Sequence, residues 1–103
     1  MAAILSVTTV RAHAGKYPDA LATFAKLKTH LERLGGKGRI VTQAFGATPL
    51  TLTLIVENAS WAEFGAMSGK AETDSELQAF LASVRANPIW DIVQRGLSTE
   101  VAA

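Results

Sequence analysis

The sequence contains no cysteine, and this absence excludes several kinds of chemistry at once. A chain without thiols has no disulfide, no thiolate nucleophile and no thiolate metal site. The fold must therefore be held by a hydrophobic core, and 103 residues are enough to form one as a single domain over residues 1–103. The cytoplasm is the default expectation for the location of this chain, because residues 1–10 match neither a signal sequence nor a membrane span.

The chain also lacks a large net charge and a long hydrophobic run. A formal net charge of +1 is too small for the whole molecule to attract nucleic acid or a membrane surface. Residues 1–10, MAAILSVTTV, contain no basic stretch, are too few to cross a bilayer and alternate like a strand. Neither a membrane nor a nucleic acid is an expected partner.

One cluster of basic residues needs a separate explanation. Four of these residues are predicted to share a helix face: Lys26, His30, Arg33 and Lys37. No aromatic residues interleave with them, as they would in a nucleic-acid surface. We interpret them as the solvated side of an amphipathic helix, with cations near its C-terminus.

Hydrophobic periodicity predicts the order β-α-β-β-α-β. Residues 4–13 are rich in β-branched side chains, which is typical of a strand. Residues 39–46 and 50–57 are predicted to form an antiparallel hairpin. Residues 89–101 form the last predicted strand, with a bulge or bend at Gly96.

Two helical regions separate these strands. The first has Pro18 in its first turn and ends at Gly35-Gly36. Its apolar face comprises Ala20, Phe24, Leu27, Leu31 and Leu34. The second region, which ends at Asn87-Pro88, is predicted as two pieces split near residues 69–73. Ser60-Trp61-Ala62-Glu63 and Thr73-Asp74-Ser75-Glu76 match the capping boxes that would begin these pieces.

The third predicted strand raises the question of what covers its second face. Leu52, Leu54 and Val56 suit a core, whereas the alternate set of Thr51, Thr53 and Ile55 is too apolar for bare solvent. Right-handed crossovers place both helical regions on one face of the sheet and leave the other face bare. Apolar side chains left in water forgo about 1–3 kcal/mol each. We therefore expect a second copy to cover this face in a homodimer.

These features resemble the dimeric α+β barrel superfamily, which includes antibiotic-biosynthesis monooxygenases, stress-responsive A/B barrel proteins and NIPSNAP-like proteins. The resemblance covers essentially the whole chain, through VTTVRAHAGKYPDALATFAKLKTHLERLG, ENASWAEFGAM and the terminal IWDIVQRGLSTEV. It implies the α+β class: a ferredoxin-like β-α-β-β-α-β fold whose four-stranded antiparallel sheet has helices on one face, paired into a dimeric α+β barrel.

The resemblance argues against haem chemistry. Haem-degrading members of the superfamily use an asparagine on the first strand and a histidine on the second helix. This chain has no asparagine in its first predicted strand and no histidine between residues 60 and 88. No cofactor is therefore predicted.

No catalytic grouping can be read from the sequence. The two histidines are far apart, without a carboxylate at ligand spacing, so no metal site is predicted. The serines do not occupy a glycine-flanked nucleophile elbow. Catalytic residues stay unknown, and whether the chain is an enzyme stays open.

Five polar residues are candidates for contact with a small molecule in the barrel: Arg11, His13, Gln43, Asp91 and Arg95. Asp91, Val93 and Arg95 are expected to share one face of the last strand, because they occupy alternate positions. We favour a cross-strand ion pair or an interface contact as the explanation of the two charged residues.

Three functions are compatible with these residues. The first is a small binding protein that holds a mostly apolar ligand in the barrel. The second is a cofactor-independent monooxygenase acting on a quinol or polyphenol, and the third is a purely structural protein whose barrel is packed solid. A pocket on the order of a few hundred Å³ with His13 or Arg95 pointing in would favour the enzyme.

Overall fold

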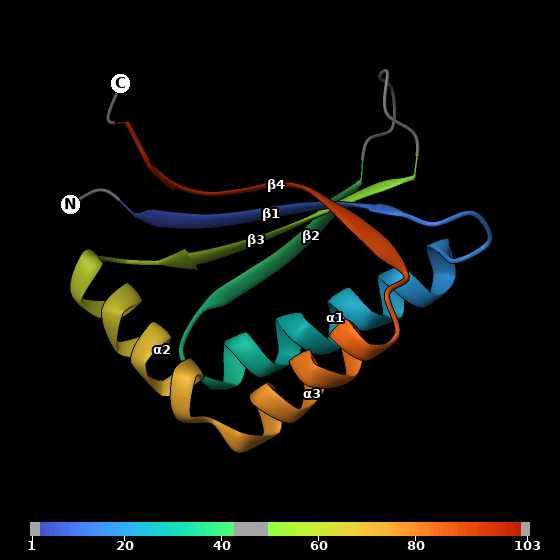
Figure 1. Cartoon of the computed structure of the whole chain (residues 1–103). Helices are drawn as coiled ribbons and strands as arrows, with labels where there is room; N and C mark the ends of the chain where they lie inside the picture. Colours follow the sequence, from blue (N-terminus) through green and yellow to red (C-terminus); the bar gives the residue numbers. More distant parts are fainter. Residues whose placement is uncertain (1–2, 43–49, 102–103) are drawn as a thin grey trace.

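The structure is a computed structural model that describes residues 3–42 and 50–101. Its elements follow the order β-α-β-β-α-α-β (Figure 1). Their bounds are β1 Ile4–Ala12, α1 Tyr17–Arg33, β2 Lys37–Thr42, β3 Thr51–Asn58, α2 Trp61–Thr73, α3 Ser75–Ala86 and β4 Trp90–Thr99. The predicted order, with a second helical region in two pieces, is confirmed.

The four strands form one sheet in the order β2-β3-β1-β4, and every neighbouring pair is antiparallel. β1 lies between β3 and β4 because each helical connection crosses over one strand. All three helices lie on the same side of the sheet (Figure 1). This is the predicted ferredoxin-like α+β fold.

The core lies between the sheet and the helices. Leu52, Leu54 and Val56 of β3 are buried there against α1, as the alternating pattern predicts. Phe24 of α1 is fully buried, and Leu77 from α3 joins the same cluster. These strands and helices therefore bury their apolar faces between the sheet and the helices.

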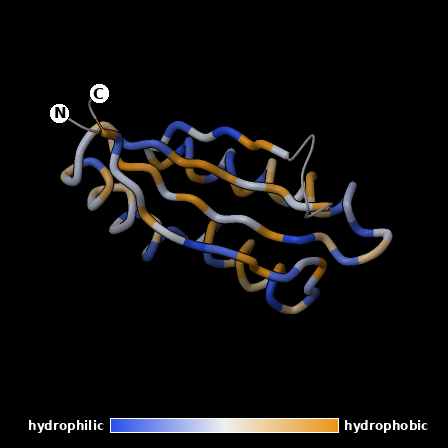
Figure 2. The backbone as a smooth tube through the Cα atoms, turned by 90° about the horizontal axis from the view of Figure 1, so that it is seen from above, coloured by the Kyte–Doolittle hydropathy of each residue, from blue (hydrophilic) through white to orange (hydrophobic). Residues whose placement is uncertain are grey.

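No helix of the described residues covers the opposite face of the sheet, which we call the open face (Figure 1). Figure 2 views the molecule from this side and shows hydrophobic and hydrophilic residues alternating along the strands. Val7 and Ile55 pair across β1 and β3 in the middle of this face, and Thr9 and Thr53 beside them share a hydroxyl hydrogen bond of 2.9 Å. The face is only partly polar, as predicted.

The helix starts agree with the sequence in one case and differ in the other. Ser60 caps α2 by accepting a hydrogen bond from the backbone N–H of Glu63, at 3.2 Å. Asp74, not Thr73, caps α3: its Oδ2 accepts from the Leu77 N–H at 2.8 Å. Thr73 is still part of α2, and its hydroxyl donates back to the Lys70 carbonyl. The break therefore falls at Asp74, one residue beyond the predicted range.

Other predicted boundaries also need correction. β2 begins at Lys37, so this lysine is a strand residue and does not extend the basic helix face. Residues 43–46 of the predicted second strand lie outside the described residues. Gly96 pairs in regular register with Val7, so the predicted bulge at this glycine is wrong.

Candidate functional site

A pocket of about 530 Å³ lies between the helix side of the sheet and the helical layer. Its walls come from β1, β3 and β4 above and from all three helices below. Most of the lining is apolar, including Leu27, Leu31, Leu54, Val56, Phe64 and Met67. A concave, mostly apolar space with a few polar groups is the usual form of a small-molecule site.

The pocket exists because the helices cover one half of the sheet better than the other. α1 packs against β2 and β3, and α2 packs against β3. β4 at the edge receives less cover, so Ile92 and Leu97 on its helix side are 57% and 50% exposed. The space between β4 and the helices stays open to a ligand.

Arg95 enters the pocket because of an irregularity in β4. Thr9 pairs with Gln94 but Val10 pairs with Ile92, which leaves Val93 as an extra residue. An extra residue of this kind changes which side chains point to which face. Arg95 therefore lies opposite Thr8 on the helix side of the sheet and lines the pocket.

Asp91 precedes the extra residue and lies on the other face. It pairs with Arg11, whose alternate neighbours Val7 and Thr9 belong to the open face. The prediction that Asp91, Val93 and Arg95 share one face is therefore wrong. Alternation holds only while the register is regular.

Three polar side chains from the helices accompany Arg95 in the pocket lining, and one of them is Ser68 of α2. Glu72 comes from α2 and Gln78 from α3. The Gln78 side chain donates to the Ala71 carbonyl at 2.8 Å. Within residues 3–42 and 50–101, neither Arg95 nor Glu72 makes a side-chain hydrogen bond or an ion pair.

Three of the other candidate residues, Arg11, His13 and Asp91, gather at one end of the sheet, away from the pocket lining. His13 Nε2 lies 3.2 Å from Asp91 Oδ1, which joins the end of β1 to the start of β4. Arg11 is exposed beside them. Gln43 lies outside the described residues. The structure thus places Arg95 in the pocket and three of the other candidates together elsewhere.

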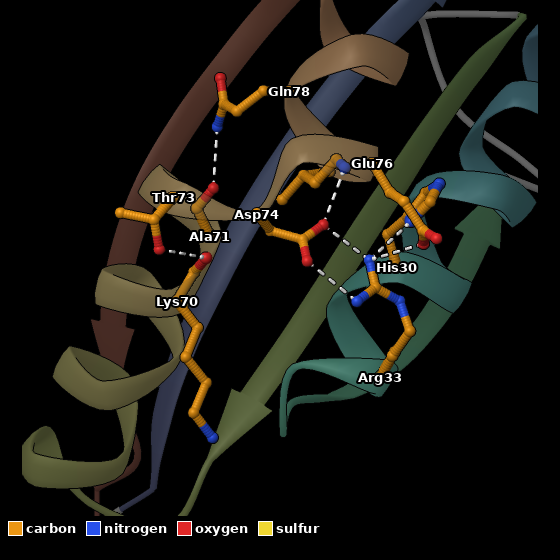
Figure 3. Close-up of polar contacts among 9 residues, drawn as sticks. His30, Arg33, Lys70, Ala71, Thr73, Asp74, Glu76 and Gln78 are labelled. Atoms are coloured by element: carbon orange, nitrogen blue, oxygen red, sulfur yellow. Dashed lines mark hydrogen bonds and ion pairs between the residues drawn. The ribbon is translucent and has the colours of Figure 1, made fainter.

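The helical wall of the pocket is fixed by an ion-pair cluster at the α2–α3 junction (Figure 3). Arg33 at the end of α1 donates to both carboxylate oxygens of Asp74, at 3.0 and 2.7 Å. This guanidinium, together with the Leu77 N–H, lowers the pKa of Asp74 to about 2. Ala71, Leu77 and Gln78 on either side of the junction all line the pocket.

The same cluster accounts for much of the basic helix face. Arg33 is neutralised by Asp74 and by Glu76, whose carboxylate lies 3.4 Å away. The His30 ring packs against Phe80 with centroids 5.3 Å apart. These two side chains therefore hold helices together rather than offer a free cationic surface.

Glu72 and Gln78 did not emerge from the sequence as site residues. Phe64, Ser68 and Ala71 fall on one side of α2 at helical spacing and line the pocket, and Glu72 extends this stripe by one position. The predicted split near residues 69–73 ends the first helical piece before Glu72, so the sequence does not show this residue as part of the stripe. Gly69 is in fact an exposed residue inside α2.

Among residues 3–42 and 50–101, no three histidine or carboxylate side chains gather at a point that could hold a metal ion. No helix within those ranges is long and apolar enough to cross a bilayer.

No protein-family model matches the sequence, and no curated protein matches it. Solved structures with similar folds do exist. An uncharacterised NIPSNAP domain protein from Burkholderia xenovorans has a TM-score of 0.72 at 18% identity, covering 97% of this chain and 94% of that chain. SnoaB, a cofactor-independent oxygenase from Streptomyces nogalater, has a TM-score of 0.72 at 14% identity, covering 100% of this chain and 97% of that one.

A third similar structure is a putative antibiotic biosynthesis monooxygenase from Chloroflexus aurantiacus. Its TM-score is 0.67 at 12% identity, and the match covers 98% of this chain and 95% of that chain. At such low identities the likeness establishes the fold alone. The chain therefore has the ferredoxin-like α+β fold of NIPSNAP and antibiotic-biosynthesis monooxygenase-like proteins.

Proposed function

We propose that this protein binds a small, mostly apolar molecule in the pocket between the sheet and the helices. The observation that carries the proposal is the pocket itself: about 530 Å³, lined mainly by aliphatic and aromatic side chains. This volume falls within the range of about 300–1,000 Å³ that is typical of small-molecule sites. A space of this size also argues against a domain that is packed solid.

A pocket-filling substitution tests this proposal. Ala71 lines the pocket from α2, and A71L would place a larger side chain in that space without harming helix propensity. The neutral fluorophore N-phenyl-1-naphthylamine reports transfer into an apolar site by increased emission. We expect the wild type to bind it saturably and A71L to bind it at least about tenfold more weakly.

The matched control is A79L. Ala79 is exposed on α3 and is absent from the pocket lining, so the same substitution there leaves the space unchanged. Equal binding by the wild type, A71L and A79L would contradict a site in this pocket. A wild type that binds no apolar probe would contradict the proposed function itself.

Cofactor-independent oxygenation of a quinol or polyphenol is the second candidate function. One specific observation favours it: Arg95 lines the pocket, where a guanidinium can stabilise a phenolate oxygen. The fold shared with SnoaB supports the same candidate by analogy alone.

A balanced probe reaction can test the oxygenase. 1,5-Dihydroxynaphthalene and O2 give 5-hydroxy-1,4-naphthoquinone and water, so one oxygen atom enters the ring and the substrate supplies all the electrons. With labelled O2, we expect one labelled atom in the quinone, a rate above autoxidation, and a lower rate for R95M. A rate equal to autoxidation would contradict this candidate and leave the binding function standing.

We also propose that a second copy of the chain covers the open face. Val7 and Ile55 in the middle of that face, and Val41, which is 45% exposed on β2, would otherwise contact water. Burying such side chains between two sheets gains about 25 cal/mol per Å² of apolar surface. Closed two-fold dimers are the commonest way to obtain this burial.

A further inference from the structure

We propose that the ligand of this pocket is a carboxylic acid with an apolar body, whose carboxylate is held by Arg95. This inference rests on the proposed binding function and names the class of ligand. It starts from the position of Arg95, which the extra residue Val93 turns towards the helices. Arg95 is thereby the cation in the lining of a mostly apolar pocket.

Arg95 is unpaired within the part of the chain that the structure describes. Among the described residues, its guanidinium makes no hydrogen bond to a side chain and no ion pair. Two other arginines are paired: Arg33 binds Asp74 and Glu76, and Arg39 lies 3.7 Å from Glu57. Arg11 and Arg85 form no ion pair among the described residues, but they lie outside the pocket lining, which leaves Arg95 as the unpaired arginine that a ligand in the pocket can reach. The donors of Arg95 are therefore available to an incoming molecule.

A ligand that fills the pocket changes the solvation of Arg95. Arg95 is exposed, so water would solvate its guanidinium while no ligand is bound. A ligand that occupies the space displaces part of this water. A neutral apolar ligand would leave a desolvated charge without a partner, which is costly, whereas a carboxylate would pair with it.

The guanidinium of Arg95 and a ligand carboxylate also match in geometry. A guanidinium presents parallel N–H donors that fit both oxygens of a carboxylate. The bidentate contact of Arg33 with Asp74, at 3.0 and 2.7 Å, is an example within this chain. A ligand carboxylate can adopt the same contact with Arg95.

Glu72 sets the orientation of the ligand. It lines the pocket from α2, whereas Arg95 lines it from β4, and the two residues form no ion pair in the described structure. The pocket therefore has a cationic side and an acidic side. An anionic ligand is attracted by the first and repelled by the second, so its carboxylate faces β4 and its apolar body faces Leu27 and Phe64.

The test compares three probes of the same shape: 2-naphthoate, 2-naphthalenemethanol and 2-naphthylmethylamine. They carry a negative charge, no charge and a positive charge at pH 7. We expect calorimetric titration of the wild type to give about tenfold tighter binding of 2-naphthoate than of the alcohol. The amine should bind most weakly.

Variants at the two charged positions assign this preference. R95M keeps an apolar stem without the charge, so it should lose about tenfold in affinity for 2-naphthoate and little for the alcohol. R95K keeps the charge without the planar fork and should be intermediate. E72Q should bind 2-naphthoate as tightly as the wild type or more tightly. R85M, at an exposed arginine of α3 that is outside the lining, is the matched control and should change nothing.

Each contrary result overturns a defined statement. Equal affinity for the acid and the alcohol would overturn the carboxylate preference and leave the binding function intact. Tighter binding of the amine, lost in E72Q, would assign the pocket to cations and overturn the inference. Saturable binding of none of the three probes would contradict the proposed function as well. Far-UV circular dichroism of R95M and R95K checks that a lost affinity is not lost folding.

Discussion

The guanidinium of Arg33 donates two hydrogen bonds, of 3.0 and 2.7 Å, to the carboxylate of Asp74. This contact joins the end of α1 to the residue that separates α2 from α3. Asp74 simultaneously caps α3 through the Leu77 N–H. One carboxylate therefore sets both the start of α3 and its position relative to α1, and with them the helical wall of the pocket.

The ion pair predicts a loss of stability in acid. The pKa of Asp74 is about 2 in the folded protein, held down by Arg33 and the Leu77 N–H, whereas an unfolded aspartate has a pKa of about 3.9. A lowered folded pKa contributes stability that is fully present above about pH 4 to 5 and is lost as the pH falls towards 2. D74N keeps an oxygen that can cap the helix but removes the charge.

Urea unfolding at several pH values measures this effect. We expect wild type to be more stable than D74N at pH 7, and the difference to shrink steadily between about pH 4 and pH 2. R33M and the double variant complete a cycle whose coupling energy should vanish over the same range. A coupling that does not change with pH would show that the pair contributes through packing and not through charge.

Replacing Gly36 or Gly69 by alanine should change the stability of the protein in opposite directions. A Cβ atom at Gly36 would lie 2.5 Å from Val56 Cγ1 and 2.9 Å from Met67 Sδ, both in the core. G36A should therefore destabilise the protein by about 1–3 kcal/mol through overpacking. A Cβ atom at Gly69 meets nothing within 4 Å, and this residue lies inside α2. G69A should stabilise by about 0.5–1 kcal/mol.

Thermal unfolding of both variants tests this contrast. The two changes add the same methyl group, so a difference in sign isolates the surroundings of each glycine. If G36A unfolded at the wild-type temperature, the close approach of the β2 entry to Val56 and Met67 would be incorrect. If G69A were destabilising, the open surface at that turn of α2 would be incorrect.

The apolar residues of the open face predict a dimer. A charged side chain introduced on this face should dissociate it. Ile55 lies in the middle of this face, between Val7 of β1 and Arg39 of β2. In a sheet-to-sheet dimer, I55R would bury guanidinium groups from both copies against apolar side chains, which is costly. Sedimentation velocity should then show a dimer for the wild type and a monomer for I55R.

L21R is the matched control for the dimer. Leu21 is an exposed apolar residue of comparable kind on α1, in the helical layer, so the same charge there should leave the dimer intact. A wild type that sediments as a monomer at micromolar concentration would contradict the dimer. Dissociation by L21R but not by I55R would move the interface to the helices.

Most of the fold could be read from the sequence because local patterns and tertiary structure agree. The alternation of Leu52, Leu54 and Val56 marks a buried strand face, and these residues are buried. Pro18 and Ser60 mark helix starts where helices do begin. Each signal depends on residues close together in the chain, so no knowledge of distant partners was needed.

The site could not be read in the same way, because its geometry depends on distant partners. The extra residue at Val93 becomes visible only when β4 is paired with β1, residue by residue. Alternation alone therefore assigned Arg95 to the wrong side relative to Asp91. The bond of Arg33 to Asp74 spans 41 residues and is equally invisible to a local pattern.

Because Val93 is an extra residue in β4, Asp91 and Arg95 lie on opposite faces of the sheet. We therefore expect these two charged residues to have different roles. Asp91 lies on the open side beside His13, and Arg95 lies on the helix side in the pocket. D91N removes a charge and a contact to an exposed histidine but does not alter the pocket lining. It should therefore leave the affinity for 2-naphthoate unchanged, whereas R95M lowers it about tenfold. The same titrations would contradict this division if D91N weakened binding as much as R95M, because a regular strand that puts both residues on one face would then describe β4 better.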